Sequence, residues 1–126
     1  MKKHKVLLNW LPAIVMCVLI FYASSIQNAE IVANPVADFG VRKIVHFFVY
    51  FVLYILFFKA TKNYKISLVL TILYGISDEI HQYFVPTRGA KVFDVVIDSL
   101  GALFANILLW KYFQHLPKIL KKWLLN

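Results

Sequence analysis

Four long apolar runs separated by short polar connections dominate the pattern of the chain. They cover about residues 6–25, 44–60, 66–85 and 92–113. A helix needs about 20 mostly apolar residues to cross the hydrocarbon core of a bilayer, and each run reaches that length alone or with its flanks. The pattern therefore predicts an all-α fold, a membrane bundle of four transmembrane helices that forms a single domain over residues 1–126.

The polar connections carry turn signals, which predict that neighbouring helices are antiparallel. Pro86–Gly89 and Lys62–Lys65 are both short, as expected between helices that fold back on each other. Residues 28–40 contain a proline and a glycine and are predicted to form the one longer loop, lying on the membrane surface. Residues 116–125 have the pattern of a basic amphipathic segment, so we expect this tail to lie on the inner leaflet.

Composition supports a membrane environment and excludes several classes of soluble protein. Hydrophobic residues make up 61% of the chain and the mean hydropathy is +0.70, which is too apolar for an ordinary soluble domain. The net charge of +8 comes from 14 Lys and Arg against 6 Asp and Glu. These basic residues flank the apolar runs, a distribution that indicates membrane topology and no nucleic-acid partner. Cys17 is the only cysteine, which excludes an internal disulfide and a multi-cysteine zinc site.

The distribution of Lys and Arg predicts the orientation, because cytoplasmic loops retain positive charge. Basic residues are concentrated at the end of the spans that carries both termini. We therefore expect a multi-pass protein of the cell membrane with both termini in the cytoplasm. The predicted inner side has Lys2, Lys3, Lys5, Lys59, Lys62, Lys65, Lys111, Lys118, Lys121 and Lys122, and the outer side has Arg42, Lys43, Arg88 and Lys91.

A cleaved signal peptide is the alternative interpretation of the first apolar run. The run follows a basic start and ends in the small residues Ala23, Ser24 and Ser25. It is longer than the apolar core of a usual signal peptide, which favours a membrane span.

Polar side chains gather at the predicted outer ends of the spans. Burying an ionisable side chain at membrane depth is costly, so such residues normally face the bundle interior or water. Spacings of four place several of them on a shared helix face, and small residues at 101, 102 and 105 allow a neighbouring helix to approach closely. We predict that they line one polar pocket, whose candidate residues are Lys43, His46, Tyr50, Asp78, Glu79, Gln82, Arg88, Asp94 and Asp98.

Some candidates also allow a purely structural role. Arg88 could be an exposed loop cation, and Asp94 could cap a helix by accepting backbone N–H bonds. A lone His46 is more often an interfacial or hydrogen-bonded histidine than a ligand or a base. Glu79 and Asp98 should both lie below the membrane interface, where a functional role is the default expectation.

The order and spacing of short motifs between Arg42 and Trp110 resemble those of the VanZ-like family. These are small bacterial membrane proteins whose founding member is associated with resistance to the glycopeptide teicoplanin. The resemblance implies a multipass cell-membrane protein linked to glycopeptide susceptibility, and it supplies no established reaction. The family often has Asn where this chain has Asp98, which makes the pocket more acidic. The motifs are Lys43-x-x-His46 with Tyr50, Glu79-x-x-Gln82, Pro86-x-Arg88, and Asp94-x-x-x-Asp98 followed by Gly101-Ala102.

The leading hypothesis is an outward-facing pocket that binds an anionic lipid headgroup or a cell-wall precursor. Arg88 and Lys43 would attract phosphate or carboxylate groups. A membrane-embedded hydrolase or transferase would add His46 or Glu79 as a general base and a divalent metal at the carboxylates. Because the sequence has no visible nucleophile or strict metal-ligand motif, no catalytic residue is assigned and no cofactor is expected.

Two further classes stay open at the level of sequence. In a structural or interaction protein the buried charges would only pair, for instance Arg88 with Asp94. In a proton-coupled carrier, Glu79 and Asp98 would form a relay. The carrier is disfavoured because no carboxylate or histidine lies on the inner half of a predicted span.

Overall fold

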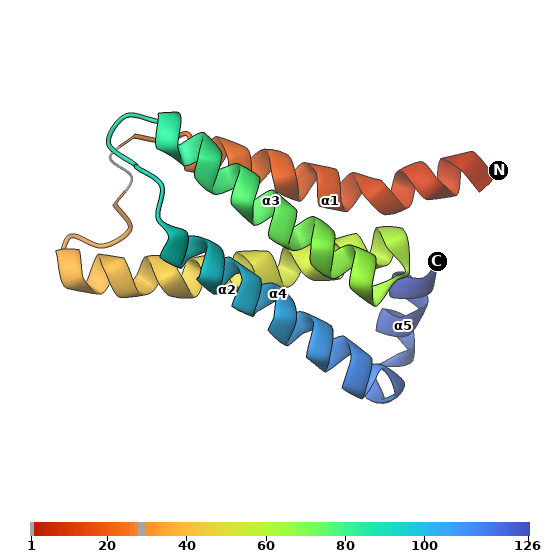
Figure 1. The fold of residues 1–126 in the computed structure, drawn as a ribbon. Coiled ribbons are helices and arrows are strands. Elements are labelled where there is room, and N and C mark those ends of the chain that lie inside the picture. Colours follow the sequence, from red (N-terminus) through yellow and green to blue (C-terminus); the bar gives the residue numbers. More distant parts are fainter. Residues whose placement is uncertain (1, 28–29) are drawn as a thin grey trace.

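Helices form almost the whole chain, which confirms the predicted all-α class. The computed structural model describes residues 2–27 and 30–126, and within these ranges it contains no strand. The side chains of Lys2 and Lys3 lie outside the described parts. In chain order the helices are α1 (Lys2–Ser24), α2 (Pro35–Thr61), α3 (Tyr64–Phe84), α4 (Val92–Tyr112), a 3-10 turn (Phe113–His115) and α5 (Lys118–Leu125) (Figure 1).

Three of the described helices are long and apolar enough to cross a membrane. These segments are His4–Ser24, Pro35–Thr61 and Val92–His115. The helix α3 has 21 residues, which suffices for a crossing by length, but its last two turns contain the polar residues Asp78, Glu79 and Gln82. That α3 is a fourth span therefore stays a prediction.

The structure corrects the predicted loop at residues 28–40, because α2 already begins at Pro35. The Asn34 side chain caps this helix by accepting the backbone N–H groups of Val36 and Ala37 at 3.0 and 3.1 Å. An Asn cap followed by Pro in the first turn is a strong helix start signal, and it outweighs the helix-breaking tendency of Gly40. Residues 28–29 of the predicted loop lie outside the described parts.

The two short connections turn the chain back as predicted. Lys62 ends α2 with φ of 56°, and its backbone N–H donates to the Phe58 carbonyl. Asn63 then caps α3 by accepting the Ile66 N–H at 3.0 Å. After α3, the Arg88 N–H donates to the Val85 carbonyl at 3.2 Å. Consecutive helices are consequently antiparallel.

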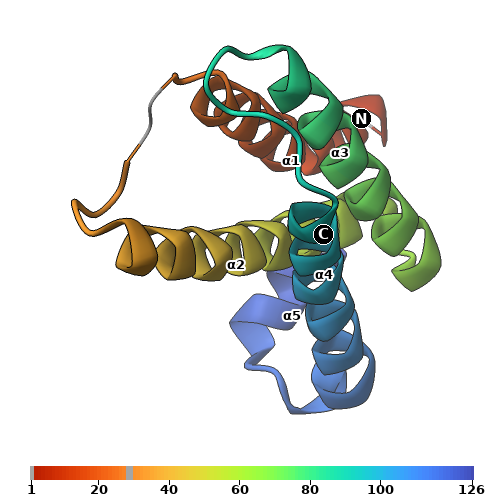
Figure 2. The same cartoon turned by 60° about the vertical axis from the view of Figure 1, so that its left-hand side comes forward.

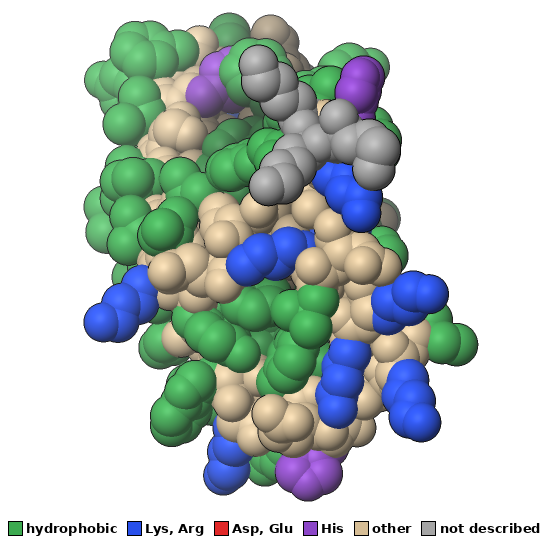
Figure 3. All heavy atoms as spheres, turned by 90° about the vertical axis from the view of Figure 1, so that its right-hand side faces the viewer, with side chains coloured by type: hydrophobic (Ala, Val, Ile, Leu, Met, Phe, Trp, Pro, Cys, Tyr) green, Lys and Arg blue, Asp and Glu red, His purple; other side chains and the backbone are tan. Residues whose placement is uncertain are grey.

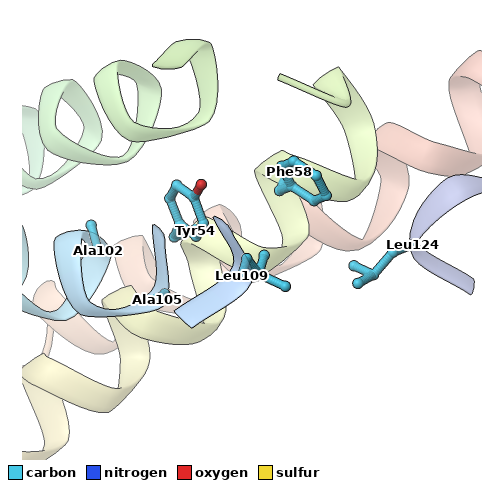
Figure 4. Packing of buried hydrophobic residues seen from close by; sticks show 6 residues of the cluster. All are labelled: Tyr54, Phe58, Ala102, Ala105, Leu109 and Leu124. Atoms are coloured by element: carbon cyan, nitrogen blue, oxygen red, sulfur yellow. The ribbon is translucent and has the colours of Figure 1, made fainter. Parts of the chain in front are cut away.

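The helix α2 is the centre of the bundle, because it contacts each of the other four helices (Figures 1 and 2). Ala102 and Ala105 of α4 are fully buried against it, and the Tyr54 hydroxyl donates to the Asn106 side chain at 2.7 Å. The predicted small-residue face of α4 is thus a packing face. The core cluster here consists of Tyr54, Phe58, Ala102, Ala105, Leu109 and Leu124 (Figure 4).

Both termini lie at one end of the bundle, and the start of α2 and the α3–α4 connection lie at the other (Figure 1). Seen from the terminal end, Lys and Arg side chains are visible among the described residues and Asp or Glu are not (Figure 3). The tail folds back as α5, whose Leu124 is 1% exposed. Lys59 holds it by donating to the Trp123 carbonyl at 3.0 Å. That this end faces the cytoplasm stays a prediction.

Candidate functional site

The polar residues of three helices meet at the end of the bundle opposite the termini. His46 of α2 contacts Asp98 of α4, with His46 Nδ1 2.9 Å from Asp98 Oδ1. Glu79 of α3 completes a group of three. One ring nitrogen of His46 and one carboxylate oxygen each of Glu79 and Asp98 lie within 4.8 Å of one another. Each of the three helices thus supplies one atom that can ligate a metal ion to a common point.

Asp78 and Gln82 extend this group into a hydrogen-bond network. The Tyr50 hydroxyl donates to Asp78 Oδ2 at 3.4 Å, and Gln82 Nε2 donates to the same oxygen at 3.0 Å. Gln82 Nε2 also lies 3.4 Å from Glu79 Oε1. Asp78 and Glu79 lie four and three residues before Gln82, and these helical spacings place the three side chains on one face of α3, toward α2 and α4.

The α3–α4 connection is held against the network at two points. The Lys91 backbone N–H donates to Glu79 Oε2 at 2.9 Å, and Arg88 Nη2 donates to Gln82 Oε1 at 3.4 Å. Arg88 is half-buried, so it is not an exposed loop cation. Burial lowers the pKa of its guanidinium, and the charge of Arg42 acts in the same direction. Arginine still remains charged at neutral pH.

Lys43 and Asp94 form an ion pair that joins α2 to α4. Two structural roles considered for Asp94 are therefore wrong. Asp94 does not cap α4, because Lys91 occupies the cap position without a side-chain hydrogen bond and Asp94 lies in the first turn. Asp94 also pairs with Lys43 and not with Arg88, because the first turn of α4 lies against α2.

Three carboxylates at the centre of the site are deeply buried. Asp78 and Glu79 are 4% exposed and Asp98 is 1% exposed. Asp78 Oδ1 and Asp98 Oδ2 are buried with no hydrogen-bond partner. Within the described residues, no Lys or Arg forms a salt bridge with these three carboxylates. Buried polar atoms without partners are rare in folded proteins, and a bound water or ion can satisfy them.

The structure adds residues that sequence reasoning did not assign to the site. Arg42 was placed at the outer end of the second span but not among the candidate pocket residues, although its spacing of four from both Asp38 and His46 could have placed it there. Its Nε donates to Asp38 Oδ2 at 2.6 Å. Gly75 was not singled out, yet a Cβ atom there would lie 3.2 Å from the Tyr50 ring and 3.5 Å from Asp98. Its lack of a side chain leaves room beside the buried carboxylate.

Two adjoining cavities open on the site. A polar cavity of about 350 Å³ has Lys43, Lys91 and Asp94 in its wall. An apolar cavity of about 420 Å³ lies between α1, α2 and α3. The two cavities share the side chains of Arg42, His46, Gln82 and Arg88.

The nine candidate residues thus occupy one region, although their function stays a prediction. Lys43 and Asp94 lie at its rim, and Arg88 and Gln82 lie between the two cavities. The remaining five residues form its centre, namely His46, Tyr50, Asp78, Glu79 and Asp98. The amino-acid sequence matches the VanZ/LLP1 family over residues 9–114. No curated protein and no solved structure shows a significant match to the chain.

Proposed function

The chain is a membrane protein of the VanZ/LLP1 family, and we propose that its polar site binds the anionic headgroup of a lipid or of a lipid-linked cell-envelope precursor. The observation that carries the proposal is the junction of the two cavities at Arg42, His46, Gln82 and Arg88. A molecule with a charged head and a hydrocarbon tail would place one part in each cavity.

The charge of the polar cavity supports an anionic head. Its wall contains four basic residues, Arg42, Lys43, Arg88 and Lys91, against the three acidic residues Glu30, Asp38 and Asp94. Arg42 and Lys43 are already paired with carboxylates, whereas Arg88 and Lys91 form no salt bridge among the described residues. The guanidinium of Arg88 has five N–H donors in a planar fork that matches phosphate and carboxylate geometry. Its one long hydrogen bond to Gln82 leaves donors for a ligand.

The other cavity supports a hydrocarbon tail. Side chains of α1 and α2 such as Leu19, Ile20 and Val49 line it. Four of its polar residues, Arg42, His46, Gln82 and Arg88, are shared with the polar cavity. Ligand sites typically combine an apolar lining with a few placed polar groups, as found here.

We also propose that the site faces the outside of the cell. The opposite end carries ten of the fourteen basic residues, which would keep it in the cytoplasm. On this topology the site would meet lipids and precursors in the outer leaflet. A contribution to glycopeptide susceptibility is part of the proposal, because such antibiotics act on that side of the membrane.

Native mass spectrometry of the full chain in neutral detergent tests the proposal. The protein is titrated with phosphatidylglycerol, a polyprenyl phosphate and phosphatidylcholine, so that two anionic sources are compared with a zwitterionic lipid. We expect tighter binding of at least one anionic lipid. Arg88→Ala should weaken that binding about tenfold or more, because hydrogen bonds to charged groups contribute about 1.5–3 kcal/mol. Lys65→Ala, at the opposite end, is the matched control.

Equal binding of all three lipids, or equal losses in Arg88→Ala and Lys65→Ala, would contradict the proposal. The second candidate would then replace it, a structural or interaction protein whose charges only pair. Three observed pairs favour that candidate, Arg42 with Asp38, Lys43 with Asp94 and His46 with Asp98.

A further inference from the structure

The group formed by His46, Glu79 and Asp98 has the composition of a metal-binding site. It contains one imidazole and two carboxylates, and each of the three comes from a different helix. Donor atoms from all three lie within 4.8 Å of one another. Helix packing therefore places three side chains that can ligate a transition metal around one point.

The local charge favours a cation at that point. Asp78, Glu79 and Asp98 are buried, and no Lys or Arg of the described chain forms a salt bridge with them. The Lys43 ammonium pairs with Asp94, and the Arg88 side chain donates to the uncharged Gln82 amide and to none of the three carboxylates. The negative charge of several carboxylates in one buried site requires positive charge nearby. A divalent ion supplies more of it than one imidazole does.

A separate observation is the unpartnered oxygen of Asp98. Its Oδ1 contacts His46, whereas Oδ2 is buried and makes no hydrogen bond. This second oxygen faces Gly75, whose missing Cβ would lie 3.5 Å away. Gly75 precedes Glu79 by one helical turn, so the free oxygen points to the face of α3 that carries the third donor.

We propose that His46, Glu79 and Asp98 bind a divalent transition-metal ion, and that Zn²⁺ fits the donor set best. Zinc accepts imidazole nitrogen together with carboxylate oxygen at about 2.0–2.2 Å, and sites with three protein ligands keep a fourth position open. Magnesium and calcium prefer an all-oxygen set, so the histidine disfavours them. Tetrahedral ligands at such distances are about 3.4 Å apart, so side-chain rotations would have to adjust the spacing of the present ligand atoms, which all lie within 4.8 Å of one another.

The site adjoins both cavities through His46, which lines each of them. An ion there would add positive charge beside Arg88 and could offer its open position to a phosphate oxygen. The metal site itself does not depend on the lipid ligand proposed above.

Calorimetric titration of the untagged full chain in neutral detergent with ZnCl₂, after treatment with a chelator, tests the inference. We expect one Zn²⁺ per chain, displaced neither by Mg²⁺ nor by Ca²⁺. His46→Asn, Glu79→Gln and Asp98→Asn keep the approximate shape of each side chain. Each should lower the affinity at least about tenfold, since even residues that only orient a ligand usually change metal affinity by that factor.

His81→Asn is the matched control. This histidine also lies in α3, but its Nε2 lies 2.8 Å from Ser25 Oγ and its ring stacks on Phe21. It should bind Zn²⁺ like the wild type. Helical content by circular dichroism shows whether each variant is folded. Because three variants are measured, the test still works if one of them does not fold.

The inference is overturned if the wild-type chain binds no stoichiometric Zn²⁺, or if the three variants bind it as tightly as His81→Asn does. An infrared band of a protonated carboxyl that disappears in Asp98→Asn would show that a proton takes the place of the metal. Lipid binding of Arg88→Ala is measured separately, so a failed metal site and a failed headgroup site give different results.

Discussion

A Cβ atom at Gly101 would lie 2.2 Å from the backbone carbonyl oxygen of Phe47. The helices α2 and α4 therefore cross with their backbones in contact, three residues after Asp98 and one residue after His46. This close crossing sets the distance between α2 and α4, two of the three helices that hold the site.

The first prediction concerns this crossing. Gly101→Ala should destabilise the protein by about 1–3 kcal/mol, the usual cost of overpacking, because the atom that it meets belongs to the backbone and must move with α2. Thermal unfolding in detergent measures the change. Gly40→Ala is the control, since nothing lies within 4 Å of a Cβ there. That change should stabilise α2 by about 0.5–1 kcal/mol, and a similar loss in both variants would refute the role of the crossing.

The second prediction concerns the site residues in cells. Glu79→Gln removes a charge and preserves shape, and Arg88→Ala removes the guanidinium between the cavities. Both should abolish any teicoplanin phenotype that the protein confers while its abundance stays nearly unchanged. Susceptibility and membrane abundance are measured together. A structural role would be favoured if both variants behave like the wild type, or if the phenotype is lost only in proportion to the loss of protein from the membrane.

The control for that experiment is a lysine at the opposite end of the bundle, and Lys62 is not suitable. Lys62 was expected to contribute only to topology, but its ammonium donates to the Leu124 carbonyl and its backbone ends α2 in a left-handed conformation. Burial also lowers the pKa of Lys62, with neighbouring Lys59 acting in the same direction. Lys65→Ala, at an exposed position of the same end, is the neutral control.

The third prediction concerns topology, including the crossing by α3. In a Cys17→Ser background, a membrane-impermeant maleimide applied to intact cells should label Glu30→Cys and Ala90→Cys but not Lys65→Cys. All three positions are exposed, and the ten basic residues at the other end should keep Lys65 inside. A reporter at Asn126 should behave as cytoplasmic. If Ala90→Cys and Lys65→Cys are both protected, α3 does not cross.

The fourth prediction concerns the docking of α5. Leu124→Ala truncates the one buried side chain of this helix, and truncating a buried leucine to alanine costs about 2–5 kcal/mol. Trypsin should then cleave at Lys121 and Lys122 faster than in the wild type. Ile119→Ala, at a position that is 85% exposed, should leave the cleavage rate unchanged, and equal rates for both variants would show that Leu124 does not hold the tail.

The amino-acid sequence by itself determined the helical fold, the membrane class, the family and the end of the bundle where polar residues gather. Apolar run length and positive charge at run ends are properties of the chain that need no tertiary information. The spacing of Asp78 and Gln82 likewise determines a shared face within one helix. The start of α2 was also readable, because Asn34 and Pro35 form a cap signal that was interpreted as a loop.

Only the tertiary structure decided which side chains of different helices meet. Periodicity orients residues around one axis, but the rotation and height of one helix relative to its neighbour depend on packing, here on the close approach at Gly101. That approach brings Asp94 to Lys43 and leaves Arg88 beside Gln82, where sequence reasoning had considered a pair of Arg88 with Asp94. It also joins His46 to Asp98, because the backbones of α2 and α4 are in contact one residue after His46 and three residues after Asp98.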